Sequence, residues 1–371
     1  MPRSSLPEPT HVVHKGLRLA AAGLICALLC MMLASNTASA FNSYQDLFVM
    51  LSARPLGMGG AAAAVSDPSS AFSNPAALAG FRGLRLMHNH SARHFPGSTE
   101  GGQSEWDQLD GDSQALVIGL PIGTYAHGFT FSGEMGYDFR GHPADGSLGY
   151  PREQYWGTQS VDAFATAAVL PVRGGIALRR EFSRFTPADD DDTGIAWLRL
   201  GEGQQTGFMA RVWPGLDYGQ SDLKMDYDWT LLQEDSERNA FSEMTSRLKL
   251  KRSGWAMHPT AWLCLASDEV NENYILEDGK QQTLENLPGL GVFHTGNRKV
   301  RRMLSGMELH LGNGLSLRQG NFDGNHTVGL SIQLPFVRAN YAEVEDLLPA
   351  IVGSGETYKD IHIYGFETEL F

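Results

Sequence analysis

Several segments of the chain alternate between apolar and polar residues. In the clearest one, Phe129–Arg140, four aromatic side chains and one methionine share a face, and polar side chains occupy the other. Leu223–Leu231 and Val328–Phe336 repeat the pattern, and Met303–Leu311 follows it more weakly. A period of two residues is typical of a β-strand, and these segments exceed the mean strand length of about 5–6 residues. The pattern predicts a protein built from long strands.

Alternation alone leaves open which medium each face meets. In a soluble sandwich the apolar face meets a core, whereas in a membrane barrel it meets lipid and the polar face lines a lumen. Three features favour a barrel. Segments of about 9–12 residues match the ~9–11 that cross a bilayer obliquely. Aromatic side chains lie near the ends of the apolar faces, and turn signals separate the segments. Roughly 12–16 strand candidates are found in this way.

Turn signals and polar stretches punctuate the strand candidates. Gly312-Asn313-Gly314 lies between two alternating triplets and predicts a hairpin, and Asp323-Gly324-Asn325 and Pro171–Gly175 are further turn signals. Two longer polar stretches, Gly141–Gly157 and Gln233–Ser242, are expected to be surface loops on the long-loop side of a barrel.

The first forty residues, Met1–Ala40, have the pattern of a secretory signal peptide. Basic residues precede the apolar run Leu19–Leu33, and Ala38-Ser39-Ala40 offers the small residues of a cleavage site. The run is short for a membrane-spanning helix of ~20 residues, so cleavage is expected rather than anchoring. No later run is long enough to span as a helix. The mature chain is therefore either free outside the inner membrane or embedded as a closed barrel.

Composition narrows the function classes. The 371 residues include 29 Lys+Arg against 42 Asp+Glu, for a formal net charge of −13, which argues against nucleic acid as a partner. Three cysteines cannot form a disulfide scaffold. Glycine is abundant, at 42 residues, or about 11% where roughly 7% is typical.

No catalytic or metal-binding motif is evident. His88, His90 and His94 lie in one segment without a carboxylate, and a histidine cluster at the rim or in the lumen is expected rather than a metal site. Asp189–Asp192 lacks the spacing of an EF-hand loop and is expected to be a solvated loop rather than a calcium site. The sequence predicts no enzyme, no cofactor and no metal.

The segment Ser52–Gly80 differs from the rest, because it is rich in Gly, Ala, Ser and Pro and does not alternate. It reads "SARPLGMGGAAAAVSDPSSAFSNPAALAG" and resembles the N-terminal signature of FadL-type and PorV/PorQ-type outer-membrane barrels. In that superfamily a GMGG-like element, an acidic turn and an NPA triplet follow the signal peptide in this order. The matching residues are Gly57, Met58, Gly59, Gly60, Asp67, Asn74, Pro75 and Ala76.

The resemblance implies an all-β fold, a transmembrane antiparallel barrel of about fourteen strands closed by a small N-terminal hatch. The expected division is a signal peptide at 1–40, a hatch or plug at 41–82 and a barrel at 83–371. Outer-membrane barrels commonly end in an alternating strand with a terminal aromatic residue. The chain matches this in part, since Tyr364, Phe366 and Leu370 alternate and the terminal Phe371 is out of phase with them. The expected surroundings are outer-membrane lipid, lipopolysaccharide and the barrel assembly machinery.

Two functions from different classes follow from the resemblance. The first is passive transport of hydrophobic small molecules, such as fatty acids or hydrocarbons, across the outer membrane. The alternative is a PorV/PorQ-like accessory barrel that binds a secreted protein or a secretion machine, and the short chain favours that branch. A third hypothesis, an enzyme acting on lipid, has no residue set to support it. The sequence names no ligand-binding residue.

Overall fold

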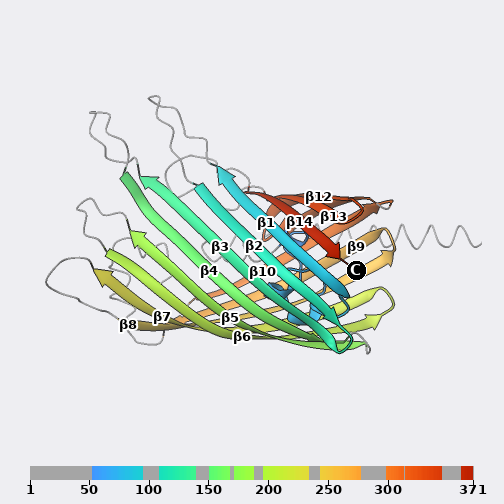
Figure 1. The fold of residues 1–371 in the computed structure, drawn as a ribbon, viewed down its shortest axis with the longest axis horizontal. Coiled ribbons are helices and arrows are strands. Elements are labelled where there is room, and N and C mark those ends of the chain that lie inside the picture. Colours follow the sequence, from blue (N-terminus) through green and yellow to red (C-terminus); the bar gives the residue numbers. More distant parts are fainter. Residues whose placement is uncertain are drawn as a thin grey trace, which may run out of the picture.

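The computed structural model describes residues 52–94, 108–138, 150–167, 171–187, 195–233, 243–276, 298–312, 314–344 and 361–370. Fourteen strands form one closed antiparallel barrel, in which each strand pairs with its neighbour in sequence and β14 pairs with β1 (Figure 1). Closure satisfies the backbone of every strand and leaves no free edge. The predicted fold class is confirmed.

The strands follow one another around the barrel as an up-and-down meander. Their bounds are β1 Gly83–His94, β2 Gln108–Leu120, β3 Gly123–Asp138, β4 Tyr150–Thr166, β5 Val172–Pro187, β6 Ile195–Trp213, β7 Leu216–Gln233, β8 Glu243–Thr260, β9 Leu263–Leu276, β10 Arg298–Leu311, β11 Leu315–Phe322, β12 Asn325–Gln333, β13 Val337–Val344 and β14 Ile361–Leu370. Strands β5 to β8 have 16–19 residues, more than the ~9–11 needed to cross a bilayer.

The two ends of the barrel differ in the length of their connections. At one end, here called the short-turn end, turns of a few residues join β2 to β3, β6 to β7 and β8 to β9. The predicted hairpin at Gly312–Gly314 joins β10 to β11 at this end, where Gly312 has a φ of 68°. At the opposite end, the long-loop end, Asp323 and Gly324 join β11 to β12 with φ values of 52° and 103°, as a type I′ hairpin turn requires.

One predicted loop is partly wrong. Residues 150–157 of the expected loop Gly141–Gly157 lie in strand β4, where they continue the pairing with β3 past a bulge at Gly136 and Tyr137. Local polarity does not prevent strand formation here, because a partner strand supplies the hydrogen bonds. Most of the other loop, residues 234–242, and the segment Asp189–Asp192 lie outside the described residues, as do the signal peptide and Phe371.

Large apolar side chains cover the outer face of the wall. Phe129, Phe131, Val328 and Ile332 are each 37–46% exposed, as the alternation of their segments predicts for a lipid-facing surface. Near the short-turn end, aromatic side chains are exposed on the outside, as in an interfacial girdle: Trp213, Tyr218, Trp255, Trp262 and Phe336. No helix among the described residues is long and apolar enough to cross a membrane.

Strand β7 reverses this arrangement. Its apolar residues Leu223, Met225, Tyr227 and Trp229 are buried against the lumen, at 1–8% exposure. The charged residues between them, Lys224, Asp226 and Asp228, are exposed on the outer face. The pattern of Leu223–Leu231 therefore predicts a strand correctly, but its apolar face meets the inside of the barrel and not lipid. Glycines on β6 make room for it, since a Cβ at Gly201 would lie 2.6 Å from the Tyr227 ring.

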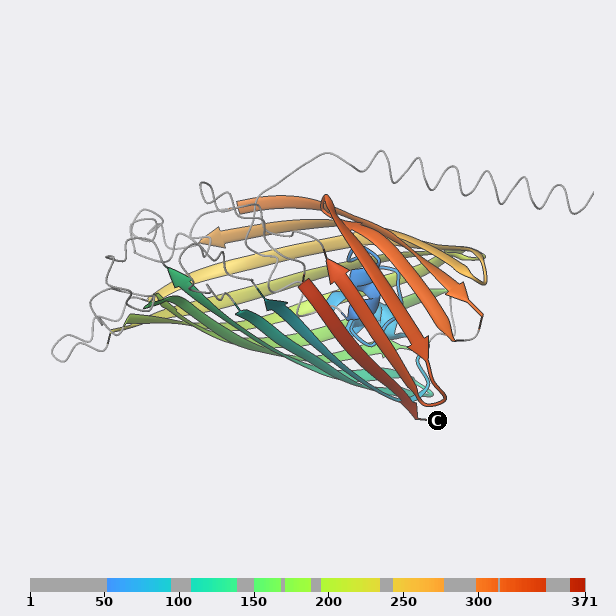
Figure 2. The same ribbon diagram turned by 90° about the horizontal axis from the view of Figure 1, so that it is seen from above.

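The segment before β1 folds back into the barrel (Figure 2). Residues 52–82, here called the hatch, contain the short helices α3 (Ala53–Gly57) and α4 (Ser70–Ser73) and the 3-10 helix η1 (Pro75–Leu78). Buried clusters join hatch residues such as Leu56, Met58 and Phe72 to inward-facing wall residues. Hatch residues contact, or share a buried cluster with, residues from all fourteen strands, so the hatch crosses the lumen.

The inner wall around the hatch is lined with small residues. Inward-facing alanines and glycines of the strands leave the space that the hatch fills. They are Ala115, Ala126, Gly128, Ala163, Ala165, Gly175, Ala177, Gly207, Gly219, Ala256, Ala266, Gly306, Gly320, Gly329 and Ala342.

Candidate functional site

The GMGG element presses against glycines of β10 to β12. A Cβ on Gly320 would collide with the backbone of Met58 and Gly59, and one on Gly306 would collide with Met58. A Cβ built on Gly57 would lie 3.0 Å from the Cα atom of Gly329. Gly59 and Gly60 have φ values of 66° and 80°, a left-handed conformation that favours glycine. Backbone therefore packs on backbone, which no larger residue permits.

Side chains of the wall satisfy the backbone of the same element. The hydroxyl of Thr327 accepts a hydrogen bond from Gly59 N at 2.9 Å and donates one to the Gly57 carbonyl at 3.2 Å. Both Ala62 N and Ala63 N donate to Oδ2 of Asp268, each at 2.7 Å. Buried backbone groups without partners would cost about 1–3 kcal/mol each, so these wall residues fix the hatch in one position.

Asp67 organises the hatch from within. Its Oδ1 atom accepts hydrogen bonds from the hydroxyls of Ser52, at 2.7 Å, and Ser69, at 2.6 Å, and from Ser69 N at 2.9 Å. The Asp67 amide in turn donates to the Ser70 hydroxyl at 3.1 Å. The acidic turn of the signature thus ties the start of the hatch to the start of α4.

The NPA triplet is held on the opposite side of the lumen, at β5 to β7. The side-chain amide of Asn74 donates to the carbonyls of Ala63, at 2.6 Å, and Phe208, at 3.2 Å. Its oxygen accepts from Ala76 N at 3.1 Å and begins η1. A Cβ on Gly175 would lie 2.5 Å from Ala76 N, so the triplet also rests on wall backbone.

The carbonyl groups at the end of α4 accept hydrogen bonds from side chains of the same strands. Gln205 and Ser221 both donate to the Ser73 carbonyl, each at 2.7 Å, and Arg179 donates to the Phe72 carbonyl. The end of α4 is therefore anchored by three side chains from β5, β6 and β7.

A charged cluster joins the hatch to β10 and β11. Nη2 of Arg54 lies 2.7 Å from Oε2 of Glu308, and Nε of Arg318 lies 2.8 Å from Oε1 of the same carboxylate. Arg54 also donates to the Ser66 carbonyl at 2.9 Å. Burial alone would lower the pKa of Arg54, but the Glu308 carboxylate outweighs it and holds that pKa above its ordinary value. Arg54 therefore stays charged and bound to the wall.

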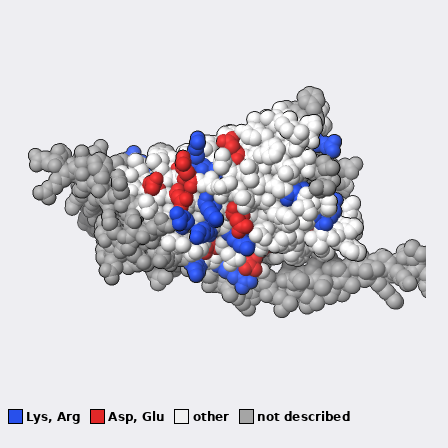
Figure 3. All heavy atoms as spheres, turned by 90° about the horizontal axis from the view of Figure 1, so that it is seen from below, with Lys and Arg blue, Asp and Glu red and all other residues white. Residues whose placement is uncertain are grey.

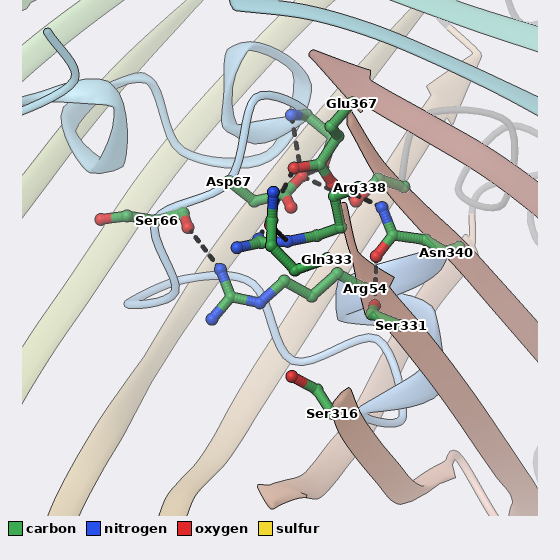
Figure 4. A network of polar contacts seen from close by, with 12 residues as sticks. Arg54, Ser66, Asp67, Ser316, Ser331, Gln333, Arg338, Asn340 and Glu367 are labelled. Carbon is green, nitrogen blue, oxygen red and sulfur yellow. Dashed lines mark hydrogen bonds and ion pairs between the residues drawn. The ribbon is translucent and has the colours of Figure 1, made fainter. Parts of the chain in front are cut away.

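Next to this cluster, a polar network runs across β12 to β14 (Figure 4). Asn340 donates to Glu367 at 2.9 Å and contacts the Ser331 hydroxyl. Arg338 donates to Gln333 at 2.9 Å and lies 3.7 Å from Glu367. Figure 4 shows Arg54 and Asp67 of the hatch facing these wall residues. One flank of the hatch is thus held by charge and the other by hydrogen bonds to α4 and η1.

On the long-loop side of the hatch, the inward face of β7 meets a buried arginine. The Arg199 guanidinium lies 4.8 Å from the centre of the Tyr227 ring and 5.4 Å from that of Trp229, and it pairs with Glu181. Tyr227 donates to Glu181 at 3.2 Å. Trp229 and Tyr274 both donate to the Ser246 hydroxyl, at 2.8 and 2.7 Å. We call Glu181, Arg199, Tyr227, Trp229, Ser246 and Tyr274 the aromatic cluster.

The prediction of a histidine cluster in the lumen is wrong for His88 and His90, and the side chain of His94 lies outside the described residues. His88 and His90 point to the outer face of β1 and not to the lumen, because the residues between and beside them, Met87 and Asn89, face the hatch. Asp112 of β2 lies beside them, 3.1 Å from Nδ1 of His90 and 3.9 Å from Nε2 of His88. The described residues contain no group of three or more His, Cys, Asp or Glu that could hold a metal.

All eight signature residues thus lie in the hatch, where Asp67 binds other hatch residues and the GMGG and NPA elements pack on the wall, but the sequence does not identify the wall partners. Thr327, Asp268 and Glu308 follow their hatch partners by more than 200 residues, and no local motif marks them or the wall glycines. The sequence does not identify the aromatic cluster either, because a membrane barrel is expected to turn the apolar face of Leu223–Leu231 toward lipid.

No family model matches the chain, and no curated protein matches its sequence. Solved structures do match its fold. The Pseudomonas putida toluene transporter TodX is 12% identical, with a TM-score of 0.57, over 86% of this chain and 98% of that one. The monoaromatic hydrocarbon channel CymD is 13% identical, with a TM-score of 0.52, over 89% and 99%. A Pseudomonas aeruginosa FadL homologue is 11% identical, with a TM-score of 0.52, over 85% and 97%.

At such identities these likenesses establish the fold. The chain has the fold of the FadL-type channels, as the signature predicts, and the alignments span almost the whole of each channel. Nothing in the comparisons supports the PorV/PorQ-like alternative.

Proposed function

We propose that the chain is an outer-membrane channel for the passive passage of hydrophobic small molecules of the hydrocarbon or fatty-acid type. A signal peptide at residues 1–40 directs the chain across the inner membrane, and the barrel assembly machinery inserts the mature chain into the outer membrane. It acts without a cofactor and is not an enzyme, in keeping with structural neighbours that are named as channels and transporters.

The proposal rests on the apolar face of β7, which faces the lumen. A strand that only had to hold a polar lumen would not bury Leu223, Met225, Tyr227 and Trp229 inside the barrel. An apolar lining with a few fixed polar groups is what a site for a hydrophobic molecule requires. The aromatic cluster supplies both, since its rings are positioned by hydrogen bonds to Ser246 and Glu181.

The hatch accounts for the other requirement of such a channel. It crosses the lumen on the short-turn side of the aromatic cluster, where it would block the free passage of water and ions. Its contacts are of two kinds: backbone packing on wall glycines, and polar groups such as Arg54–Glu308 that can exchange partners. We infer that Gly57, Met58, Gly59, Gly60, Asp67, Asn74, Pro75 and Ala76 serve to seat this plug.

A deletion strain tests the proposal. Uptake of a labelled alkylbenzene and a labelled long-chain fatty acid is measured in cells with the gene, without it and with it restored on a plasmid. A labelled disaccharide serves as the polar control. We expect uptake of at least one hydrophobic compound to fall on deletion and return on complementation, with no change for the disaccharide. Unchanged uptake of both hydrophobic compounds would refute transport of these classes.

A further inference from the structure

A belt of charged side chains crosses the outer face of β5 to β10 (Figure 3). The register of the strands places its members side by side: Arg180 opposite Glu202, Glu202 opposite Asp226, and Asp226 opposite Arg247. The surface on the short-turn side of the belt is largely uncharged (Figure 3). We call this row the charged belt, which comprises Arg180, Glu202, Asp222, Lys224, Asp226, Arg247, Lys249, Lys251, Glu269 and Arg301.

The height of the belt matches the outer edge of a membrane. Arg180 comes eight residues after Val172, and Lys224 eight after Leu216, at the starts of their strands. Eight residues of a strand tilted by about 40° rise roughly 20 Å along the barrel axis, close to the ~25 Å of an apolar band. The exposed aromatic residues Trp213 and Trp262 mark the other edge, at the short-turn end. The belt would thus lie at the headgroups of the outer leaflet.

Most acidic members of the belt are already engaged. Glu202 lies 3.8 Å from Arg180, Asp226 pairs with Arg247, and Glu269 lies 3.0 Å from Arg301. Asp222 accepts a hydrogen bond from Gln220 at 3.1 Å. Asp222, which lies opposite Lys251, keeps its negative charge, and the six basic and four acidic side chains of the belt leave it with a net charge of +2.

Three lysines remain in the middle of the belt. Lys224 and Lys249 lie directly opposite each other on β7 and β8, and Lys251 is next on the same face. All three are exposed, and none forms an ion pair with a carboxylate of the described residues. Like charges directly opposite each other destabilise a pair of strands, so an anion bound between Lys224 and Lys249 would offset their repulsion.

We propose that Lys224, Lys249 and Lys251 bind a phosphate group of the lipopolysaccharide in the outer leaflet. Phosphate recognises lysine as a point charge, and a row of three ammonium groups at headgroup height fits a phosphorylated glycolipid whose acyl chains lie along the apolar wall below. Here Ile176 and Leu178 of β5 and Phe208 of β6 provide that wall. The inference rests on the outer-membrane placement proposed above.

Binding of purified lipid A tests this inference. Protein extracted from outer membranes into mild detergent is examined by native mass spectrometry with bisphosphorylated lipid A, dephosphorylated lipid A and phosphatidylglycerol as probes. We expect wild-type protein to prefer bisphosphorylated lipid A. The K224Q/K249Q variant should bind it about tenfold or more weakly, since each basic residue near a membrane surface contributes about 1 kcal/mol. K224R/K249R should retain binding, and Arg82→Gln, an exposed change at the short-turn end, should leave it unchanged.

Three results would overturn the inference: equal binding by K224Q/K249Q and wild type, equal binding of dephosphorylated lipid A, or equal binding of phosphatidylglycerol, which would indicate a site without glycolipid preference. The extraction itself separates this inference from the proposed function. A chain missing from the outer-membrane fraction contradicts the proposed function, whereas a chain present there without lipid A contradicts only the lysine site.

Discussion

Arg54 of the hatch and the buried Glu308 of β10 form a partly buried ion pair across 254 residues of sequence, with 2.7 Å between Nη2 and Oε2. Arg318 of β11 contacts the same carboxylate. The pair exists only when the hatch lies in the closed barrel, so it couples the position of the plug to the integrity of the wall.

Breaking this pair should loosen the hatch. We expect Arg54→Gln to destabilise the protein by about 1.5–3 kcal/mol, because the Glu308 carboxylate loses its hydrogen bonds from Arg54 but keeps its contact with Arg318. The measurement is the free energy of unfolding in detergent, followed by circular dichroism. Arg180→Gln removes an arginine from an exposed pair and should cost no more than about 1 kcal/mol. Equal effects of the two changes would show that the hatch pair does not hold the plug.

The wall glycines should tolerate no side chain where the hatch packs on them. Gly320→Ala places a methyl group against the backbone of Gly59 and should cost about 1–3 kcal/mol, as overpacking does. Gly174→Ala is the matched control, because a Cβ at Gly174 meets nothing within 4 Å. Unfolding temperatures of the two variants give the comparison. A stable Gly320→Ala protein would contradict the close packing of the GMGG element.

The NPA triplet should stabilise the hatch and thereby keep the lumen closed. Asn74→Ala removes three hydrogen bonds of the hatch, two of them to carbonyls and one from Ala76 N. Each buried group left without a partner costs about 1–3 kcal/mol, which should shift the hatch toward an open position. We expect cells that produce this variant to become more sensitive to a bulky polar antibiotic. Unchanged sensitivity at equal protein level would argue against a sealing role.

The outer face below the charged belt should be lipid-facing. Ile176, which is 51% exposed, comes four residues after the start of β5. We expect Ile176→Arg to reduce folding stability in lipid vesicles by about 2–4 kcal/mol, as charged residues at the bilayer midplane do. Gln204→Arg, at the height of the belt, should have a much smaller effect. Similar costs for both would contradict the placement of the membrane.

Much of the fold could be predicted from the sequence, because strand alternation and turn chemistry are local. Residues 129–138 and 328–333 of the two predicted segments lie in β3 and β12, with Phe129 and Val328 turned outward. Residues 334–336 lie in the turn to β13, and residues 139 and 140 lie outside the described residues. The hairpins after Leu311 and Phe322 form at their glycines.

The orientation of faces could not be predicted in the same way. Leu223–Leu231 alternates like the other segments, but its apolar face turns inward because Gly201 and Gly203 of the neighbouring strand leave room for Tyr227 and Met225. His88 and His90 face outward for a related reason, since the hatch takes up the space on the inner side of β1. These outcomes depend on contacts distant in sequence, which a period of two does not encode.

The central claim is that hydrophobic molecules pass along the inward apolar face of β7. The most direct test is the uptake rate of a labelled alkylbenzene or fatty acid in the deletion strain carrying the Y227A/W229A variant. The control is Tyr218→Ala, which removes an aromatic ring from the outward face of the same strand. The account predicts about a tenfold loss for Y227A/W229A, as expected from about 1.4 kcal/mol of lost contact, and no change for Tyr218→Ala. Wild-type uptake by Y227A/W229A at equal amounts of folded barrel would contradict it.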